Sequence, residues 1–330
     1  MKQREWLTQK LFDRGLISES QFDSVKTYRS LGIFSVRNEL LFLLYLSVLM
    51  FTSGIGIVIY QNIDSIGHMA LLAITLAAAI GCYWISFKKA PGFSVNRVEF
   101  ENPIYDYAVL TGTLLICIFF GYLQTQYTAL GEGYSLAALA SAIISIGAAY
   151  YFDNRSSLSI GITALAAFVG ITATPKAVVQ NEMYTHPAQT YFGLMLAMAL
   201  IGWYEYSRKH GIKSHFLLIV ATFALHLIGI CSLKGLFEDM WPIFVLVLGA
   251  ACYYFYRMSY ELASRSLFVF TLLYAYFGAN IIIGKFLDGI DSFALIQIIT
   301  FLSPAYLILS IFLFIRLVKR FNQRTNDGEE

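Results

Sequence analysis

Apolar stretches long enough to span a membrane recur along most of the chain, separated by short polar segments. Crossing a bilayer takes about 20 mostly apolar residues in a helix. A helix also forms its backbone hydrogen bonds internally, as the lipid environment requires. The pattern therefore predicts an all-α, polytopic membrane protein. Its ten expected transmembrane helices are 40–61, 67–87, 105–124, 134–152, 156–173, 188–207, 214–231, 240–257, 263–284 and 293–318.

Short motifs recur at the ends of these stretches. The sequence GAAYYF, ending at Phe152, returns as GAACYYF, ending at Phe255, and weaker copies begin at Gly81 and Gly202. The helices that carry these motifs run in the same direction, which predicts stacked helical hairpins, the same unit being used about four times. We expect the recurring glycines to let helices approach closely. On the returning helices these glycines are Gly121, Gly170, Gly229 and Gly278.

Composition and charge add an orientation. The chain is 58% apolar and 13% charged, whereas about a quarter of a soluble domain is charged, so an ordinary soluble protein is excluded. All but three of the 23 lysines and arginines lie in the amino-terminal segment, in alternate connections and near the carboxyl terminus. By the positive-inside rule, both termini are predicted to be cytoplasmic. The three exceptions are Lys176, Lys234 and Lys285, in outer loops that also carry Asp64, Glu132, Glu182, Glu238, Asp239, Asp288 and Asp291.

The segment before the first apolar stretch has its own helical pattern. Its apolar residues up to Phe12 have helical spacing, and Gly15 suits the position that ends a helix. Ser18 and Gln21 are spaced as a capping box, which starts a second helix with Phe22 on its apolar face. We therefore expect three parts: a cytoplasmic helical hairpin at 1–39, a transmembrane domain at 40–318 and a cytoplasmic tail at 319–330.

These motifs carry a family resemblance. LTQKLFDRGLISESQFDSVKTY is similar to the short helical hairpins with a G-[IL]-I-[ST]-x-x-[QE]-F core that are attached to many bacterial membrane proteins. With the preceding Trp6, the following spans and the Tyr122-Leu123-Gln124-Thr125 run, the chain resembles the predicted membrane proteins of domain-of-unknown-function family 2157. The resemblance implies a bacterial inner-membrane protein and brings no known activity with it.

Motifs of enzymes are missing from the sequence. It contains no H-E-x-x-H pair, no phosphate-binding glycine loop and no G-x-S-x-G elbow. Cys82, Cys117, Cys231 and Cys252 all fall within spans and form no C-x-x-C pair, which is typical of small buried apolar residues. The spans also lack a row of carboxylates for a proton- or sodium-coupled pump. We therefore expect no catalytic residues, no metal site and no cofactor.

The candidate binding residues lie on the predicted outer side. Gln124, Gln126 and Glu132 join the third and fourth spans, where polar side chains could line a vestibule or simply face solvent. His226 is the histidine furthest inside a span, and it is either a hydrogen-bonded packing residue or a deeper wall of the site. An acidic vestibule would favour cationic or hydroxyl-rich ligands over anions.

These observations favour a non-enzymatic membrane protein that binds a lipid, a peptide or a protein partner in a groove of the helical array. The expected partners are the lipid bilayer and a membrane or periplasmic protein, and no nucleic acid is expected. A small-molecule transporter is the alternative, because ten spans also fit two inverted halves of five helices.

Overall fold

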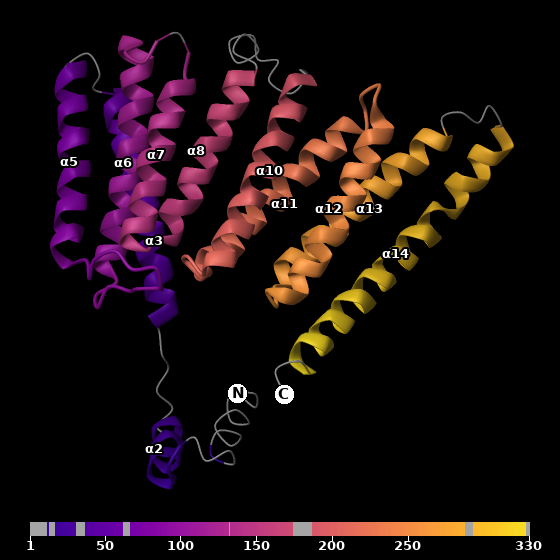
Figure 1. Ribbon diagram of the computed structural model, residues 1–330, viewed down its shortest axis with the longest axis horizontal. Coiled ribbons are helices and arrows are strands. Elements are labelled where there is room, and N and C mark those ends of the chain that lie inside the picture. Colours follow the sequence, from indigo (N-terminus) through magenta and orange to yellow (C-terminus); the bar gives the residue numbers. More distant parts are fainter. Residues whose placement is uncertain are drawn as a thin grey trace. The chain divides into compact units, whose positions relative to one another are not determined.

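The structure is a computed structural model that describes residues 12, 17–30, 37–61, 67–131, 133–173, 187–287 and 293–327. The chain forms two compact units, Met1–Ser53 and Gly54–Glu330. In the described residues every regular element is helical, which confirms the predicted all-α class (Figure 1). The α-helices are α2 (Glu19–Ser30), α3 (Arg37–Gln61), α5 (His68–Lys89), α6 (Ile104–Tyr127), α7 (Ser135–Phe152), α8 (Arg155–Ala173), α10 (Pro187–His210), α11 (Leu217–Gly235), α12 (Trp241–Glu261), α13 (Arg265–Leu287) and α14 (Phe293–Asp327).

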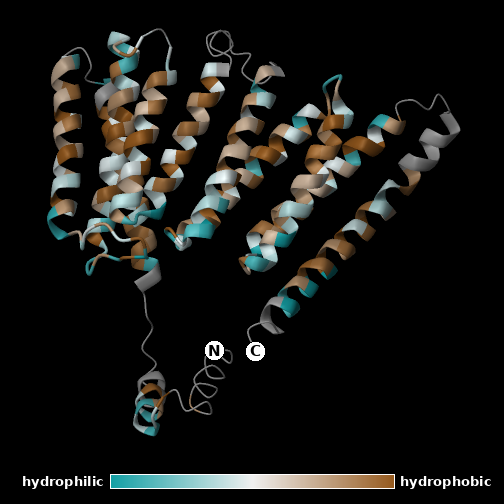
Figure 2. Ribbon diagram, viewed as in Figure 1, coloured by the Kyte–Doolittle hydropathy of each residue, from teal (hydrophilic) through white to brown (hydrophobic). Residues whose placement is uncertain are grey.

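Nine helices within the described ranges are long and apolar enough to cross a membrane, so the protein is a polytopic helical membrane protein. The expected number was ten, and the difference is α10. This helix is long enough, but its mean hydropathy is lower. The polar contributions come from Gln189, several aromatic residues and the charged end at Glu205 and Arg208. Figure 2 shows the apolar middle and polar ends of the neighbouring helices.

The capping box of the amino-terminal segment is present in the structure. The backbone N–H of Ser18 donates to Oε1 of Gln21 at 2.9 Å, and the backbone N–H of Gln21 donates to Oγ of Ser18 at 3.3 Å. The ring of Phe12 stacks on that of Phe22, with 4.7 Å between their centroids. Gly15 lies outside the described residues. The two side chains of the box thus satisfy free amides at the start of α2, as its spacing predicts.

Helices that follow one another in the sequence pack in pairs within the unit Gly54–Glu330. The most extensive packing joins α7 to α8, α10 to α11, α5 to α6 and α12 to α13. These are the four pairs expected to form hairpins, and α6–α7, α8–α10 and α11–α12 contacts link one pair to the next (Figure 1). That the pairs are copies of one repeated unit stays a prediction, as do the predicted boundaries at residues 39 and 318.

The connections after α5, α7, α10 and α12 lie at one end of these helices, which we call the basic end. The name reflects the lysines and arginines found there, namely Lys88, Lys89, Arg155, Arg208, Lys209, Lys213, Arg257 and Arg265, together with Arg316, Lys319, Arg320 and Arg324 of α14. The opposite end is called the acidic end. The distinction matters below because the structure places its buried charges at the basic end.

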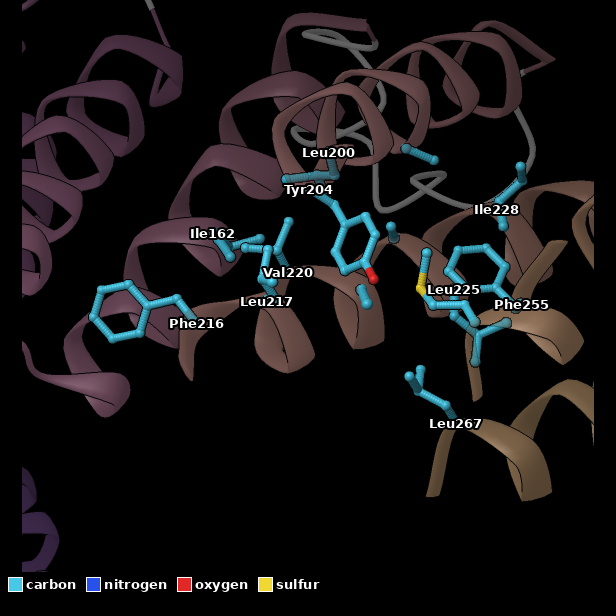
Figure 3. Close-up of a cluster of buried hydrophobic side chains, with 14 of the residues drawn as sticks. Ile162, Leu200, Tyr204, Phe216, Leu217, Val220, Leu225, Ile228, Phe255 and Leu267 are labelled. Carbon is cyan, nitrogen blue, oxygen red and sulfur yellow. The ribbon is translucent and has the colours of Figure 1, made fainter. Parts of the chain in front are cut away.

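The largest apolar core forms where α8, α10, α11 and α12 meet. Ile162, Leu200, Leu225 and Phe255 are each at most 2% exposed. Figure 3 shows the ring of Tyr204 inside this cluster, with side chains of α10 and α11 around it. An apolar side chain is about as stable against lipid tails as against the side chains of a neighbouring helix. Burial here therefore reflects close packing rather than exclusion from water.

The recurring glycines do not all serve close packing. A Cβ added at Gly229 would lie 2.6 Å from the Tyr274 ring, and one added at Gly278 would collide with Leu248. No described atom lies within 4 Å of the corresponding position at Gly121, Gly170, Gly147 or Gly249. The expectation of close approach is therefore right for the two glycines on α11 and α13, whereas no described neighbour lies close to the other recurring glycines, including Gly81 and Gly202.

Candidate functional site

Gln124, the first of the predicted binding residues, is buried at the acidic end of α6. Its Nε2 donates hydrogen bonds to the carbonyl oxygens of Gly131 and Gly133, each at 2.7 Å. Its Oε1 accepts a bond from the backbone N–H of Leu130 at 3.0 Å. Both amide hydrogens of Gln124 are therefore used inside its own loop. The side chain holds the connection from α6 to α7 in place, a role that the sequence pattern did not indicate.

The other two residues of the predicted vestibule differ from Gln124. Gln126 is exposed on the last turn of α6. Glu132 lies outside the described residues. Their contact with a ligand stays a prediction, and Gln126 is the described residue of this group with an accessible side chain.

His226 lies on the side of α11 that faces α13. Its Nδ1 is 2.9 Å from the Tyr274 hydroxyl, and its ring packs against Phe270 with 4.6 Å between centroids. In the described residues, Gln124 bonds to its own loop, whereas His226 bonds to α13, so Gln124 and His226 share no hydrogen-bond partner. The hydrogen bond agrees with the packing interpretation of this histidine, and its role as a deeper wall of a binding site stays a prediction.

The aromatic pairs at the basic end link neighbouring helix pairs. The Tyr83 hydroxyl is 3.0 Å from Oγ1 of Thr113, which in turn is 2.8 Å from Oγ of Ser157 on α8. Trp203 Nε1 donates to the Tyr150 hydroxyl at 2.8 Å, which joins α10 to α7. In the pairs Tyr83/Trp84 and Tyr253/Tyr254, the other ring, Trp84 or Tyr253, is exposed on the outside of its helix. One ring of these motifs thus binds a neighbouring helix, which sequence spacing could not distinguish from a lipid anchor.

A further cluster at the basic end carries charge. Tyr254 donates to Oε1 of Glu205 at 2.6 Å, and Arg208 pairs with Glu205 at 2.8 Å and with Glu261 at 2.7 Å. These residues, with Arg257, line a small cavity of about 200 Å³ between α10 and α12. Arg208 of α10 bonds Glu261 of α12, and Tyr254 of α12 bonds Glu205 of α10, so the cluster ties the two helices together.

The most deeply buried charges belong to an ion pair at the turn between α7 and α8. Lys213 Nζ lies 2.8 Å from Oδ2 of Asp153, and both side chains are at most 3% exposed. The backbone N–H of Val98 donates to the same Oδ2 at 2.7 Å, and His215 contacts the other carboxylate oxygen. The backbone N–H of Lys213 also donates to the carbonyl of Val95 at 2.9 Å. This cluster, here named the Asp153 cluster, fastens the connection after α5 to two other turns.

No sequence motif indicated the Asp153 cluster. Asp153 and Lys213 are 60 positions apart, and each has a left-handed backbone conformation, with φ of 62° and 48°. Such a conformation is uncommon for residues other than glycine and favours asparagine and aspartate, which explains Asp153 as the residue that ends α7. The pairing required the fold, because only tertiary structure brings these two turns together.

The best candidate for a ligand-binding groove lies between α13 and α14. It has a volume of about 480 Å³ and is lined on one side by Leu272, Leu273 and Tyr276, and on the other mainly by aliphatic residues of α14 from Leu307 to Leu317. Its polar groups on α14 have partners on α13: Tyr306 donates to Oδ1 of Asn280 at 3.1 Å, and Ser310 donates to the Tyr276 hydroxyl at 3.4 Å. The interior that remains is apolar.

The two helices also meet at the basic end of the groove. The rings of Phe268 and Phe321 stack with 4.4 Å between centroids, and the Phe321 ring contacts Tyr260. Pro304 lies within α14, which is helical on both sides of it. Within the described ranges, no group of three or more histidine, cysteine, aspartate or glutamate residues could hold a metal ion. The groove therefore offers shape and apolar surface rather than chemistry.

Comparison with known proteins agrees with the resemblance seen at the amino terminus. No curated protein and no solved structure matches the chain. The matched region includes α2, the connection stabilised by Gln124 and the turn that contains Asp153. Residues 9–158 match the family model described as predicted membrane protein (DUF2157), which confirms the resemblance to that family and adds no activity to it.

Proposed function

We propose that this membrane protein is a non-enzymatic lipid-binding protein that holds an acyl chain in the groove between α13 and α14. The observation that carries the proposal is the groove itself, about 480 Å³ of apolar space between two helices of membrane-spanning length. Ligand sites are typically concave and mostly apolar, with few polar groups. An acyl chain needs no hydrogen bonds. The hydroxyl groups of Tyr276, Tyr306 and Ser310 already have hydrogen-bond partners in the protein.

A peptide fits the groove less well than a lipid. Extended peptides expose backbone N–H and C=O groups, and an unpaired backbone group costs several kcal/mol in a lipid environment. Tyr276, Tyr306 and Ser310 already have partners within the groove. A lipid chain can occupy it without leaving any backbone group unpaired.

The groove can be tested by filling it. Leu313→Trp places a large ring in the groove, whereas Ile308→Trp adds the same ring to an exposed position of α14 that does not line it. The purified full-length protein in mild detergent would be examined by native mass spectrometry and by cross-linking with a phospholipid that carries a photoactivatable acyl chain. We expect Leu313→Trp to abolish retained phospholipid and cross-links to α13 and α14, while Ile308→Trp keeps both.

Two results would contradict the proposal. Equal lipid retention and labelling in the two variants would mean that the lipid only surrounds the helices. If reconstituted vesicles take up a small solute and Leu313→Trp blocks that uptake, the transporter hypothesis is supported instead.

The predicted outer site stays a separate proposal. The residues proposed to contact a cationic or hydroxyl-rich ligand there are Gln124, which also holds its own loop in place, and Gln126, Glu132 and His226. The proposed location is the bacterial inner membrane with both termini cytoplasmic, which makes the basic end cytoplasmic. It is supported by the distribution of lysine and arginine. In a cysteine-free background, Asp239→Cys should react with an impermeant thiol reagent in intact cells and Lys209→Cys should not; the reverse would invert the orientation.

A further inference from the structure

We infer that the groove between α13 and α14 selects anionic phospholipids, because Arg316, Lys319 and Arg320 form a headgroup site at its basic end. The inference rests on the proposed lipid-binding function and names the class of lipid that the same site takes. The ligand is a phospholipid whose phosphodiester headgroup reaches these three side chains while one acyl chain lies in the groove.

The first supporting observation is the continuity of one edge of α14. Leu309, Leu313, Arg316 and Arg320 have the spacing of residues on one side of a helix, so this edge runs from apolar to basic. Leu309 and Leu313 line the apolar groove. The same two leucines line a second hollow of α14 together with Arg316, Lys319, Arg320 and Gln323. A lipid whose chain contacts Leu309 and Leu313 therefore has its headgroup within reach of the basic residues.

The second observation is that these three cations have no acidic partner. All three are exposed, and no carboxylate in the described part of the chain pairs with them. Two other cations of the basic end differ: Arg208 pairs with two glutamates and Lys213 is buried against Asp153. Arg316, Lys319 and Arg320 thus keep their full charge for a ligand.

The chemistry of these side chains favours a phosphate. A guanidinium group can donate two parallel hydrogen bonds to phosphate oxygens, and lysine adds a compact positive charge. Arg316 and Arg320 are four residues apart, so their side chains project from adjacent turns of the same edge. Basic residues at the cytoplasmic end of a transmembrane helix attract anionic headgroups. A zwitterionic headgroup gains less, because its own cation opposes the positive site.

The test compares two lipids with identical acyl chains, phosphatidylglycerol and phosphatidylcholine, bound to the full-length protein in mixed micelles. The variant Arg316→Gln/Lys319→Gln/Arg320→Gln removes the proposed site. The control Lys88→Gln/Lys89→Gln/Arg155→Gln removes three cations at the same end from α5 and α8, which do not line the groove. Each basic residue near an anionic headgroup contributes roughly fivefold in affinity, so up to on the order of 100-fold is at stake.

We expect the first triple variant to lose most of its preference for phosphatidylglycerol and to bind phosphatidylcholine as the parent does. The control should keep the preference. Arg316→Lys with Arg320→Lys, which retains the charge, should keep most of it and show that a loss is not due to misfolding.

The outcomes separate the inference from the function on which it rests. If Leu313→Trp removes both lipids but the triple glutamine variant keeps the preference, groove binding stands and the headgroup site is wrong. If Leu313→Trp changes neither lipid, the proposed function itself is wrong. If inorganic phosphate alone displaces phosphatidylglycerol at millimolar concentration, the basic residues form a free anion site and the inference is overturned.

Discussion

The helices α11 and α14 are both apolar and of similar span length, yet the structure uses them differently. Half of the apolar stretch of α11 is buried by neighbouring helices, against 6% of that of α14. Around α11, α8, α10, α12 and α13 pack closely, and buried charges join the nearby turns. Beside α14, only α13 packs extensively in the described residues, and a groove remains between the two.

The contrast shows what determines helix packing when the surroundings are lipid. Apolar area cannot distinguish the two helices, because lipid tails are as apolar as leucine side chains. Close approach, interhelical hydrogen bonds and ion pairs distinguish them instead. The region around α11 has Gly229 against Tyr274 and the Asp153 cluster near its start, whereas α14 has satisfied hydroxyl groups and unpaired cations. The first region is built for stability, and the second leaves room for a ligand.

The largest expected effect comes from breaking the Asp153 cluster. Asp153→Asn keeps the size of the side chain and suits the left-handed backbone but leaves Lys213 buried without its counter-ion. Removing one partner of a buried ion pair typically costs about 3–5 kcal/mol. We expect a decrease of about that size in the free energy of unfolding, measured by denaturant titration in micelles.

The exposed pair of the same connection provides the control. Arg97 and Glu99 form an ion pair whose side chains are 54% and 64% exposed. Glu99→Gln should therefore lower the free energy of unfolding by less than about 1 kcal/mol. Asp153→Asn combined with Lys213→Met should recover most of the lost stability. Equal effects of Asp153→Asn and Glu99→Gln would show that the buried cluster does not distinguish this region.

A smaller effect is expected from the close approach of α11 and α13. In Gly229→Ala the new methyl group meets the Tyr274 ring, and that ring also carries the hydroxyl bonded to His226. Overpacking of this kind typically costs about 1–3 kcal/mol. Gly249→Ala adds the same methyl group in open space, and its better helix propensity should stabilise the protein by up to about 1 kcal/mol. Thermal unfolding that ranks the two variants in the opposite order would contradict this interpretation of α11.

The smallest effect is expected in the groove. Leu313 is 56% exposed and lines the groove. Leu313→Trp should therefore change the free energy of unfolding by less than about 0.5 kcal/mol, as exposed substitutions commonly do. Leu225→Trp, at a position 2% exposed in the core, is the matched substitution and should cost more than about 1 kcal/mol. Similar losses in the two variants would mean that the groove is packed as tightly as the core.

Sequence spacing predicted local structure well because local interactions determine it. The capping box of Ser18 and Gln21 needs only residues three apart, and its hydrogen bonds are present. The expected helix pairs also form between neighbours in the sequence, and short turns join α7 to α8 and α12 to α13. Within the described residues, nine of the ten expected spans are long and apolar enough to cross a membrane; α10 has the length of a span and packs with α8 and α11, but it has a more polar composition.

The candidate site was harder to predict for a physical reason. Gln124 was predicted to line a vestibule because it is polar and lies at the end of a span; the structure adds that its amide closes a loop whose path the sequence does not reveal. The glycines Gly229 and Gly121 recur at similar positions of their helices, but only the neighbour that each helix receives decides whether a Cβ would fit. The same holds for the groove, which exists because α14 packs against α13 at Phe268 and leaves space elsewhere.

By itself, the sequence determined that this is an all-helical membrane protein, roughly where its apolar helices lie, and which ends carry positive charge. Those properties follow from runs of apolar residues, capping side chains and the distribution of lysine and arginine, each readable over short distances. Tertiary structure decided that Asp153 meets Lys213, that Tyr150 meets Trp203 and that a groove lies beside Leu313. In lipid every apolar face is equally well solvated, so the apolar pattern cannot specify which helices become neighbours.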